Sequence, residues 1–282
     1  MMFVFLNGQI VKEEDARISI DDLSYQFGYG LFETIRCEKG IPLFIEEHYK
    51  RMSHGAKELK MTFPIDIEDL KGWLKQVLSA NKLLNARVKV LVSKKAEEKF
   101  NVLILVSGIE KPPSSYSLCT KTLVRDTKSA SFVNKTTSRA DSFISYKGAN
   151  ENGFNDMLYL NEKGELLECT RANIFLVLED KLITPNLEAG ILSGVTRGKV
   201  IEIAKNDGII VEERNVHRLY LNKVLSVFVT SAMMGIMLVS KIVFEDKEYN
   251  FTSDKVIIRL KNSYDAEIQN YLKSQENIAI AH

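Results

Sequence analysis

The amino-acid sequence predicts an α+β protein in which β-strands outnumber helices. Many short segments are rich in β-branched and aromatic residues and end at turn-forming residues, as strands do. Only a few longer segments carry apolar residues at the three- and four-residue spacing of a helix. The sequence has no internal repeat or low-complexity tract, which argues against a repeat architecture.

The first half of the chain is predicted to contain a hairpin, a long strand, two helices and an antiparallel strand pair. The opening MMFVFLNGQIV has two apolar runs separated by Asn7-Gly8, a dipeptide that favours a tight turn with positive φ. Residues alternate in YGLFETIRCEKG, which predicts a strand, whereas apolar residues from Ile45 to Leu59 recur at helical spacing. A second helix is expected at 66–79, and ARVKVLVS should pair with NVLILVSG across KKAEEKF.

The segment EKPPSSYS, residues 110–117, marks a domain boundary because its proline and serine residues do not continue a strand. We predict a small N-terminal α/β domain at 1–112, a linker at 113–120 and a larger C-terminal domain at 121–282. In the second half, strands are predicted at 118–124, 156–160, 165–169, 173–179, 181–184, 208–213, 224–231 and 236–243. Helices are predicted at about 141–150, 195–206 and 254–272.

Composition and charge narrow the classes of function. Of the 282 residues, 45% are hydrophobic and 27% are charged, which is ordinary for a soluble globular enzyme. The net charge of +1 gives no overall field that would attract nucleic acid or an anionic membrane. The three cysteines lie far apart and fit neither a disulfide framework nor a zinc site. The apolar runs are too short for a signal core or a membrane span, so we expect a cytoplasmic protein without a metal.

A loop bracketed by glycines leads into a helix in GILSGVTRGKVIEIAKNDG. Ser193 is a candidate N-cap and Val195 is expected to begin the helix, whose first N–H groups suit a phosphate dianion. Thr196 adds a hydroxyl group. Arg197 is unusual here, because a cation in the first turn opposes the helix dipole by about 0.3–1 kcal/mol unless an anion lies nearby. The alternative is an ordinary capped helix with Arg197 in solvent.

Arg51 and Glu168 are candidate partners of a charged ligand. Arg51, in HYKRMSHGAKEL, is expected on the flank of the apolar stripe of its helix, where its guanidinium could bind a phosphate. The alternative is a surface arginine whose aliphatic part covers apolar residues. Glu168, in GELLECTRANIFLV, stands where an apolar residue would continue the row along the strand. A buried acid needs a partner, either a protonated ring nitrogen or a structural arginine such as Arg171.

Lys135 lies in SFVNKTTSRADS, among short polar side chains that provide hydrogen-bonding groups with little bulk. A lysine whose ammonium form is destabilised becomes a nucleophile able to form a Schiff base, although most lysines are simply solvated. Together with Glu168, Arg51 and the helix start at Val195 and Thr196, Lys135 completes a set of groups that holds pyridoxal 5′-phosphate.

Six segments stand in a fixed order along the chain: YQFGYGLFETIR, EEHYKRM, VNKTTSR, GELLECTRANIFLV, LITPNLEAGILSGVTR and VFVTSAMMGIMLV. They resemble segments of the class IV aminotransferases. These are the fold-type IV pyridoxal-phosphate enzymes, which include branched-chain aminotransferases, D-amino-acid aminotransferases and aminodeoxychorismate lyases. The resemblance covers nearly the whole chain and is specific, because the motifs keep their order with suitable gaps.

The resemblance implies a small α/β N-terminal domain, a larger C-terminal domain with a barrel-like sheet that carries the cofactor lysine, and a homodimer. It implies that Lys135 forms the aldimine with pyridoxal phosphate and acts as a general base. Glu168 would keep the ring nitrogen protonated. The implied cofactor-binding residues are Lys135, Glu168, Arg51, Val195, Thr196 and Ser231.

The substrate-binding part of the sequence departs from the family pattern. The Asn-Tyr pair common after the lysine of branched-chain enzymes is replaced by Ser138, Arg139 and Ala140, and the RxH motif of the D-amino-acid enzymes is absent. In VTSAMMG, Ala232 and Gly235 replace a threonine and a glutamate that are common in relatives. Candidate substrate-pocket residues are Tyr25, Arg87, Lys89 and Arg139, with Arg36 and Arg125 as further candidates for the substrate carboxylate.

Two reactions fit the resemblance. The predicted function is a class IV aminotransferase that moves an amino group between an amino acid and a 2-oxo acid. The alternative is a 4-amino-4-deoxychorismate lyase that releases pyruvate and 4-aminobenzoate, supported by Arg139 and by the ECTRAN and SAMMG wording. Lys135 and Glu168 would serve in both reactions. A remote alternative, motivated by Ala232 and the absent tyrosine, is a non-catalytic protein that binds pyridoxal phosphate.

Overall fold

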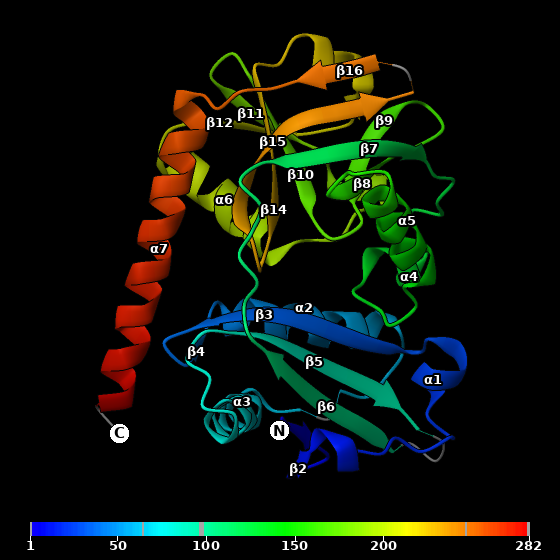
Figure 1. Ribbon diagram of the computed structural model, residues 1–282, viewed down its shortest axis with the longest axis vertical. Helices are drawn as coiled ribbons and strands as arrows, with labels where there is room; N and C mark the ends of the chain where they lie inside the picture. Colours follow the sequence, from blue (N-terminus) through cyan, green and yellow to red (C-terminus); the bar gives the residue numbers. More distant parts are fainter. Residues whose placement is uncertain (1, 64, 96–98, 246, 281–282) are drawn as a thin grey trace. The chain divides into compact units, whose positions relative to one another are not determined.

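The computed structural model describes residues 2–63, 65–95, 99–245 and 247–280. The chain divides into two compact units, which are described separately below (Figure 1). The first unit comprises the described residues of Met1–Lys111, Asn134–Arg139 and Ile268–His282. The second unit comprises Pro112–Val133 and Ala140–Glu267. The first unit therefore gathers three separate segments of the chain.

A six-stranded antiparallel sheet forms the first unit, with strand order β2-β1-β6-β5-β3-β4. The predicted hairpin is confirmed, because Asn7 and Gly8 join β1 to β2 with positive φ angles of 49° and 93°. The predicted pairing of ARVKVLVS with NVLILVSG is also confirmed, although part of the turn between them lies outside the described residues. The strands are β1 (Phe3–Leu6), β2 (Gln9–Lys12), β3 (Gly30–Glu38), β4 (Ile41–Pro42), β5 (Ala86–Lys94) and β6 (Phe100–Ser107).

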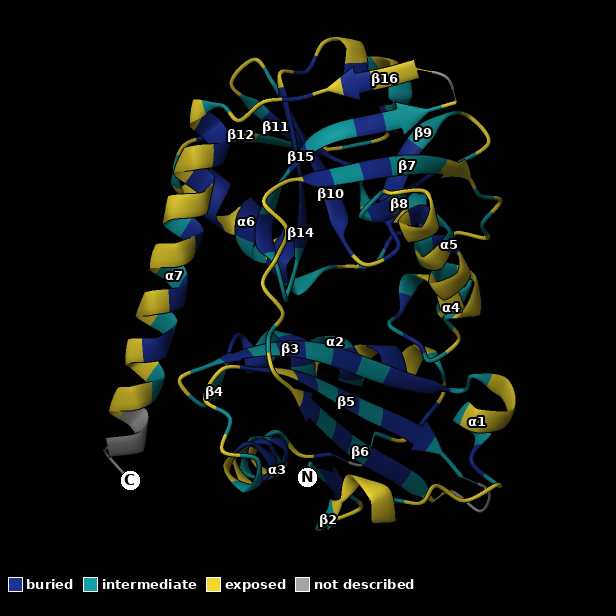
Figure 2. Cartoon of the chain, viewed as in Figure 1, coloured by how far each residue is buried: buried dark blue, intermediate teal, exposed yellow. Residues whose placement is uncertain are grey.

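Two long helices, α2 (Ile45–Glu58) and α3 (Ile67–Ala80), pack on one face of this sheet and share its hydrophobic core. Alternation along β3 directs Leu31 and Ile35 into this core and turns Phe32 to the opposite, half-buried face. Figure 2 shows the buried residues concentrated along the strands and on the inner sides of the helices. The short elements of the unit are η1 (Glu13–Asp15) and α1 (Leu23–Phe27).

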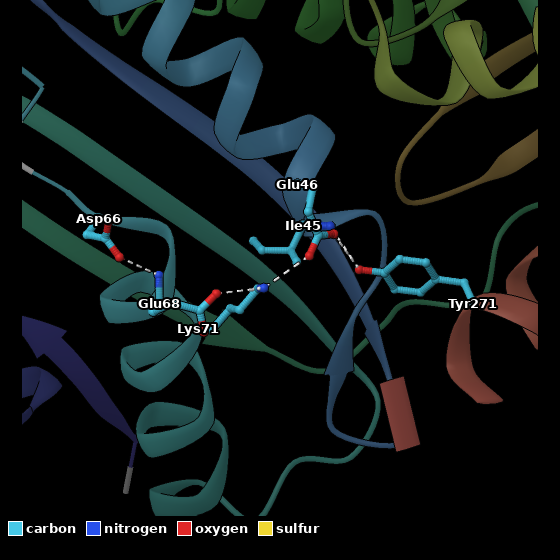
Figure 3. A network of polar contacts seen from close by, with 6 residues as sticks. All are labelled: Ile45, Glu46, Asp66, Glu68, Lys71 and Tyr271. Carbon is cyan, nitrogen blue, oxygen red and sulfur yellow. Dashed lines mark hydrogen bonds and ion pairs between the residues drawn. The ribbon is translucent and has the colours of Figure 1, made fainter. Parts of the chain in front are cut away.

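The C-terminal part of α7 (Lys255–Ile280) joins the first unit through a polar network (Figure 3). The hydroxyl of Tyr271 accepts a hydrogen bond from the backbone N–H of Ile45 at 3.3 Å and donates one to Glu46 at 3.0 Å. Lys71 on α3 binds Glu46 at 3.1 Å. The network therefore ties the beginning of α2 to both α3 and α7.

A closed six-stranded barrel forms the centre of the second unit. Its strands follow the order β10-β14-β15-β7-β8-β9, and the pair Asn173↔Glu168 joins β9 back to β10. The predicted barrel-like sheet is therefore confirmed. The barrel strands are β7 (Tyr116–Thr122), β8 (Asp156–Leu160), β9 (Glu165–Cys169), β10 (Asn173–Leu178), β14 (Ser226–Ser231) and β15 (Gly235–Phe244).

Further strands and helices surround this barrel. Helix α5 packs against β8, and α6 packs against β12 and β14. None of the helices in the described part of the chain has the length and hydropathy needed to cross a bilayer. The added elements are α4 (Ala130–Val133), α5 (Ala140–Glu151), β11 (Lys181–Thr184), η3 (Leu187–Ala189), α6 (Val195–Asn206), β12 (Ile210–Glu213), β13 (Val216–His217), η4 (Arg218–Asn222) and β16 (Lys247–Asn250).

The division into units differs from the sequence-based domains at the segment Asn134–Arg139. The sequence-based division assigns Lys135 to a C-terminal domain, whereas this segment groups with the first unit. The reason is backbone pairing with β3: Phe32 N–H donates to the carbonyl of Lys135, and Thr137 N–H donates to the carbonyl of Gly30, both at 2.9 Å. The first unit thus completes its sheet edge with residues from the middle of the chain.

Candidate active site

Glu168 lies at the end of β9 and is only 7% exposed, so its carboxylate needs a compensating partner. That partner is Arg125, whose Nη1 donates to Oε1 of Glu168 at 2.9 Å. The second oxygen, Oε2, accepts a hydrogen bond from the backbone N–H of Leu192 at 3.0 Å. Arg171, the structural partner considered from the sequence, instead stacks on Tyr146 with its Cζ 3.5 Å from the ring centroid.

The beginning of α6 lies in the second unit and has a buried hydroxyl group in its first turn. Helix α6 starts at Val195 as predicted, but its N-cap is Gly194, not Ser193, and no side chain caps its first turn. Thr196 is 2% exposed, and its hydroxyl has no hydrogen-bond partner among the described residues. First-turn N–H groups beside a buried, unpaired hydroxyl are suited to bind a phosphate.

A second unpaired hydroxyl belongs to Thr230, which was not among the residues predicted for the site. Thr230 lies on β14 opposite Asn173 of β10, and α6 packs against β14. Its side chain is buried without a hydrogen-bond partner in the described part of the chain. The next residue, Ser231, is less buried, and its hydroxyl accepts a hydrogen bond from Met234 N–H at 3.2 Å. A run of β-branched and apolar residues gave no signal that one hydroxyl would remain unpaired.

Arg197 does not extend into solvent. Its side chain is 4% exposed, and Nη2 binds Glu213 at 2.9 Å and the carbonyl of Pro185 at 2.8 Å. The unfavourable position of a cation near the helix start is therefore offset by Glu213, so Arg197 gives no support to a bound phosphate.

Lys135 is half-buried in the first unit, between Asn134 and Thr136, which are both buried. Strand-like alternation turns the lysine side chain to the other side of the segment, where its Nζ lies 4.6 Å from the ring centroid of Phe32. Phe32 is on the half-buried face of the six-stranded sheet. The backbone pairing with β3 therefore holds the Lys135 side chain on the Phe32 side of the sheet.

Arg51 on α2 forms a buried cluster with Glu33 and His48. Its Nε and Nη2 donate to the two carboxylate oxygens of Glu33 at 2.7 and 2.6 Å, and His48 Nδ1 donates to Oε2 at 2.7 Å. Burial raises the pKa of Glu33, but Arg51 and His48 outweigh this effect and hold it well below its ordinary value. Burial lowers the pKa of His48, and the attraction of Glu33 offsets only part of that shift. The cluster therefore fixes the guanidinium plane of Arg51.

Three predicted substrate cations, Arg87, Lys89 and Arg139, belong to the first unit, and Lys89 lies on the face of the sheet that carries Phe32. Lys89 Nζ is 4.9 Å from the centroid of the Phe32 ring, and Arg87 lies two residues earlier on β5. Burial lowers the pKa of Lys89, and the like charges of Arg87 and Arg139 lower it further. An anion at this face would relieve that repulsion.

The other substrate candidates are placed differently. Tyr25, on α1, is 80% exposed. Arg36 forms an ion pair with Glu38 at 2.6 Å, and Arg125 is engaged with Glu168. Among the cations considered for a substrate carboxylate, Arg87 and Arg139 thus lie close enough to Lys89 to lower its pKa, whereas Arg36 and Arg125 form ion pairs with glutamates.

Comparison with solved structures identifies the fold. A branched-chain aminotransferase from Thermoproteus uzoniensis superposes with a TM-score of 0.86 at 23% sequence identity, covering 96% of this chain and 95% of that chain. The antiparallel sheet and the closed barrel are therefore those of a fold-type IV enzyme.

The family is defined by sequence. Residues 30–242 match the family model described as amino-transferase class IV. A putative branched-chain-amino-acid aminotransferase from Methanocaldococcus jannaschii is 30% identical over 252 residues, which cover 82% of this chain and 85% of the relative. An aminodeoxychorismate lyase from Bacillus subtilis is 27% identical over 287 residues, covering 95% and 96%. The chain belongs to the class IV aminotransferase family and is an enzyme.

Proposed function

We propose that this enzyme is a pyridoxal-phosphate-dependent aminotransferase that moves an amino group between an amino acid and a 2-oxo acid. The observation that carries the proposal is the combination, within the second unit, of the buried Glu168 with an uncapped helix start and the unpaired hydroxyl of Thr196. A buried acid suits a protonated ring nitrogen, and the helix start suits a phosphate. Family membership and the M. jannaschii relative support the same reaction.

The residues present fit pyridoxal phosphate. The N–H groups of Val195 and Thr196 and the hydroxyl of Thr196 would hold the phosphate. Ser231 and the unpaired hydroxyl of Thr230 are proposed as further ligands from β14, on which α6 packs. Arg51 is proposed as a further phosphate ligand, held in orientation by Glu33. Bound phosphate would supply the hydrogen-bond acceptors that the two buried hydroxyl groups lack.

The chemistry divides between the bound cofactor and two side chains. When bound, pyridoxal phosphate supplies an electron-accepting ring conjugated to the substrate amine. The Nζ of Lys135 would accept the proton from the substrate Cα when it is in its neutral amine form, because an amine is a base of suitable strength. The carboxylate of Glu168 keeps a proton on the ring nitrogen. Arg87, Lys89 and Arg139 are proposed to bind a substrate carboxylate, with Tyr25 as an additional pocket residue.

The lyase reaction is the second candidate. The B. subtilis relative named aminodeoxychorismate lyase aligns over nearly the full length of both chains. The same Lys135 and Glu168 would serve a reaction that converts 4-amino-4-deoxychorismate into pyruvate and 4-aminobenzoate. We further propose that the enzyme is cytoplasmic and that it forms a homodimer. Light scattering of the purified enzyme would test the homodimer.

Two measurements test these proposals. Borohydride reduction followed by peptide mapping is expected to recover the cofactor covalently attached to the peptide that contains Lys135. Attachment elsewhere would contradict the assignment of this residue. The holoenzyme is then mixed with single amino acids, and conversion of the cofactor to its pyridoxamine form is followed by absorbance. No conversion with any donor, together with pyruvate release from aminodeoxychorismate, would favour the lyase.

A further inference from the structure

A closed ring of contacts in the second unit ties Glu168 to the beginning of α6. Glu168 and Asn173 are opposite each other where the barrel closes. The side-chain amide of Asn173 donates to the carbonyl of Leu192 at 2.9 Å, and Leu192 N–H donates to Oε2 of Glu168 at 3.0 Å. Leu192 is two residues before Gly194, the N-cap of α6. The acid and the helix start are thus linked through both backbone and side chains.

Arg125 fixes the other oxygen of this carboxylate. Its Nη1 donates to Oε1 of Glu168 at 2.9 Å and to the carbonyl of Gly190 at 2.8 Å, and its side chain is only 7% exposed. Its Cζ lies 5.1 Å from the ring centroid of Phe132 and 5.8 Å from that of Tyr159. Charge-assisted hydrogen bonds and cation–π contacts together restrict the guanidinium to one orientation.

This arrangement leaves Glu168 able to bind another donor. A carboxylate offers about four acceptor sites, and the two hydrogen bonds from Arg125 and Leu192 each use one of them. The ring nitrogen and the phosphate of pyridoxal phosphate are held at a nearly constant separation by the aromatic ring. A site for both therefore benefits when the acid and the phosphate-binding helix start are held at a fixed spacing before the ligand arrives.

We propose that Arg125 is a positioning residue that acts through Glu168 on the ring nitrogen of the cofactor. Together with Asn173 and Leu192, it fixes the acid relative to the start of α6. This inference rests on the proposed binding of pyridoxal phosphate and adds a residue that does not itself touch the cofactor.

The first experiment measures ligand affinity without turnover. Cofactor-free enzyme is titrated with pyridoxamine 5′-phosphate, which does not bond covalently to Lys135, and binding is followed by calorimetry. Arg125→Met is expected to raise Kd by about tenfold or more, as for the loss of a hydrogen bond to a charged group. A matched analogue, in which a C–H group replaces the ring nitrogen, is expected to bind the native and Arg125→Met enzymes within about twofold of each other. Arg218→Met, which removes an arginine stacked on Phe244, is the control and should leave both affinities unchanged.

A double-mutant cycle gives an independent test. If Arg125 acts through Glu168, adding Arg125→Met to a Glu168→Gln enzyme should change the Kd for pyridoxamine 5′-phosphate by less than about twofold. Equal weakening of the natural ligand and the carbon analogue by Arg125→Met would overturn the proposal, as would an unchanged Kd. If Arg125→Met does not fold, the Kd values of the two ligands are compared in Arg125→Lys instead. This variant keeps a positive charge, so it should retain more than half of the native preference for pyridoxamine 5′-phosphate over the carbon analogue. Failure of the native enzyme to bind pyridoxamine 5′-phosphate would instead overturn the proposed function.

Discussion

Gly194 is required because of a neighbouring side chain and not because of its backbone angle. Its φ of −67° is open to any residue, but an added Cβ would lie 2.1 Å from Oδ1 of Asn173. The Asn173 side chain has little freedom to move, because its amide is bound to Leu192 and it is buried. A methyl group at Gly194 must therefore displace the start of α6.

Gly194→Ala is expected to lower the free energy of unfolding by about 1–3 kcal/mol, as overpacked substitutions do, and to weaken phosphate binding. Gly198→Ala is the matched control, since it lies in the same helix and nothing lies within 4 Å of an added Cβ. This control should stabilise the enzyme by about 0.5–1 kcal/mol because alanine is the better helix former. Urea unfolding of both variants tests the pair; a Gly194→Ala enzyme as stable as the native one would contradict the steric argument.

The buried cluster of Glu33, His48 and Arg51 makes stability depend on pH. Because the pKa of His48 is lowered in the folded chain, the unfolded chain binds a proton at this residue first as pH falls through its ordinary value of 6.5. The free energy of unfolding therefore decreases on acidification, by at most about 1.4 kcal/mol per pH unit for one proton. Glu33 has a lowered pKa, so its contribution is present above 4.5 and is lost as pH falls further.

His48→Gln is expected to flatten the pH dependence that begins below pH 6.5, while leaving the loss below pH 4.5. Thermal unfolding measured at several pH values would show this as a smaller decrease of Tm over the upper window. His54→Gln, at an exposed position on the same helix, serves as control and should keep the native profile. An unchanged slope in His48→Gln would mean that another group titrates there.

The residue types at the site were predictable, but their partners were not. Lys135 and Glu168 lie in sequence motifs, VNKTTSR and GELLECTRANIFLV, that resemble those of a known family. The pairing of Glu168 with Arg125, 43 positions away, depends on the closure of the barrel and the path of the loop through Gly190. The unpaired hydroxyl of Thr230 is likewise visible only when its surroundings are folded. Contacts between distant segments leave no local pattern in the sequence.

Helix α2 begins without a cap of its own and takes one from α7. Phe44 occupies the N-cap position with a φ of 54° and makes no side-chain hydrogen bond. The hydroxyl of Tyr271 accepts from the first helical N–H group, that of Ile45, and donates to Glu46 (Figure 3). The helix that carries Arg51 and His48 is therefore stabilised by residues more than 200 positions later in the chain.

Tyr271→Phe is expected to lower the free energy of unfolding by about 1–2 kcal/mol, the usual effect of losing a cap and a hydrogen bond. Lys71→Met removes a half-buried member of the same network and should cost less than about 1 kcal/mol, as for exposed ion pairs. Chemical denaturation would rank the two variants. A larger effect from Lys71→Met would show that the ion pairs, and not the cap, hold this corner.

Elements with a regular apolar pattern were predicted more accurately than elements without one. The helix predicted at 195–206 has the bounds of α6, and the strands at 156–160 and 165–169 match β8 and β9. The five-residue α1 was missed because its start is defined by Asp22, which accepts hydrogen bonds from two backbone N–H groups, and not by apolar spacing. The two-residue β13 exists only because it pairs with β9.

At the level of the whole molecule, the two compact units change between Lys111 and Pro112, within the proline- and serine-rich segment at 110–117. The composition of the sequence does not indicate that the chain returns to the first unit at Asn134 and again at Ile268. These returns depend on backbone pairing with β3 and on the packing of α7, which are contacts between distant residues.

A chain shortened to residues 112–282 is expected to lose the ordered backbone of Asn134–Arg139, because β3 is absent. Limited proteolysis should then cleave near Lys135, and the fragment should fail to retain pyridoxal phosphate after borohydride treatment. The full-length chain under the same protease treatment is the control and should stay intact at this segment. Protection of Lys135 in the fragment would show that β3 is not needed to order it.

The short return of the chain at Asn134–Arg139 also constrains how this enzyme can be recombined. Swapping everything after residue 112 for the matching half of a relative would bring in a foreign partner for β3 along with a foreign barrel. A working chimera must therefore transfer the Lys135 segment, and the part of α7 that begins at Ile268, together with residues 1–111. The Lys135 segment alone requires two additional crossover points within ten residues of each other. Recombination at a single junction is thus expected to give inactive hybrids, even where each half folds and functions in the enzyme from which it was taken.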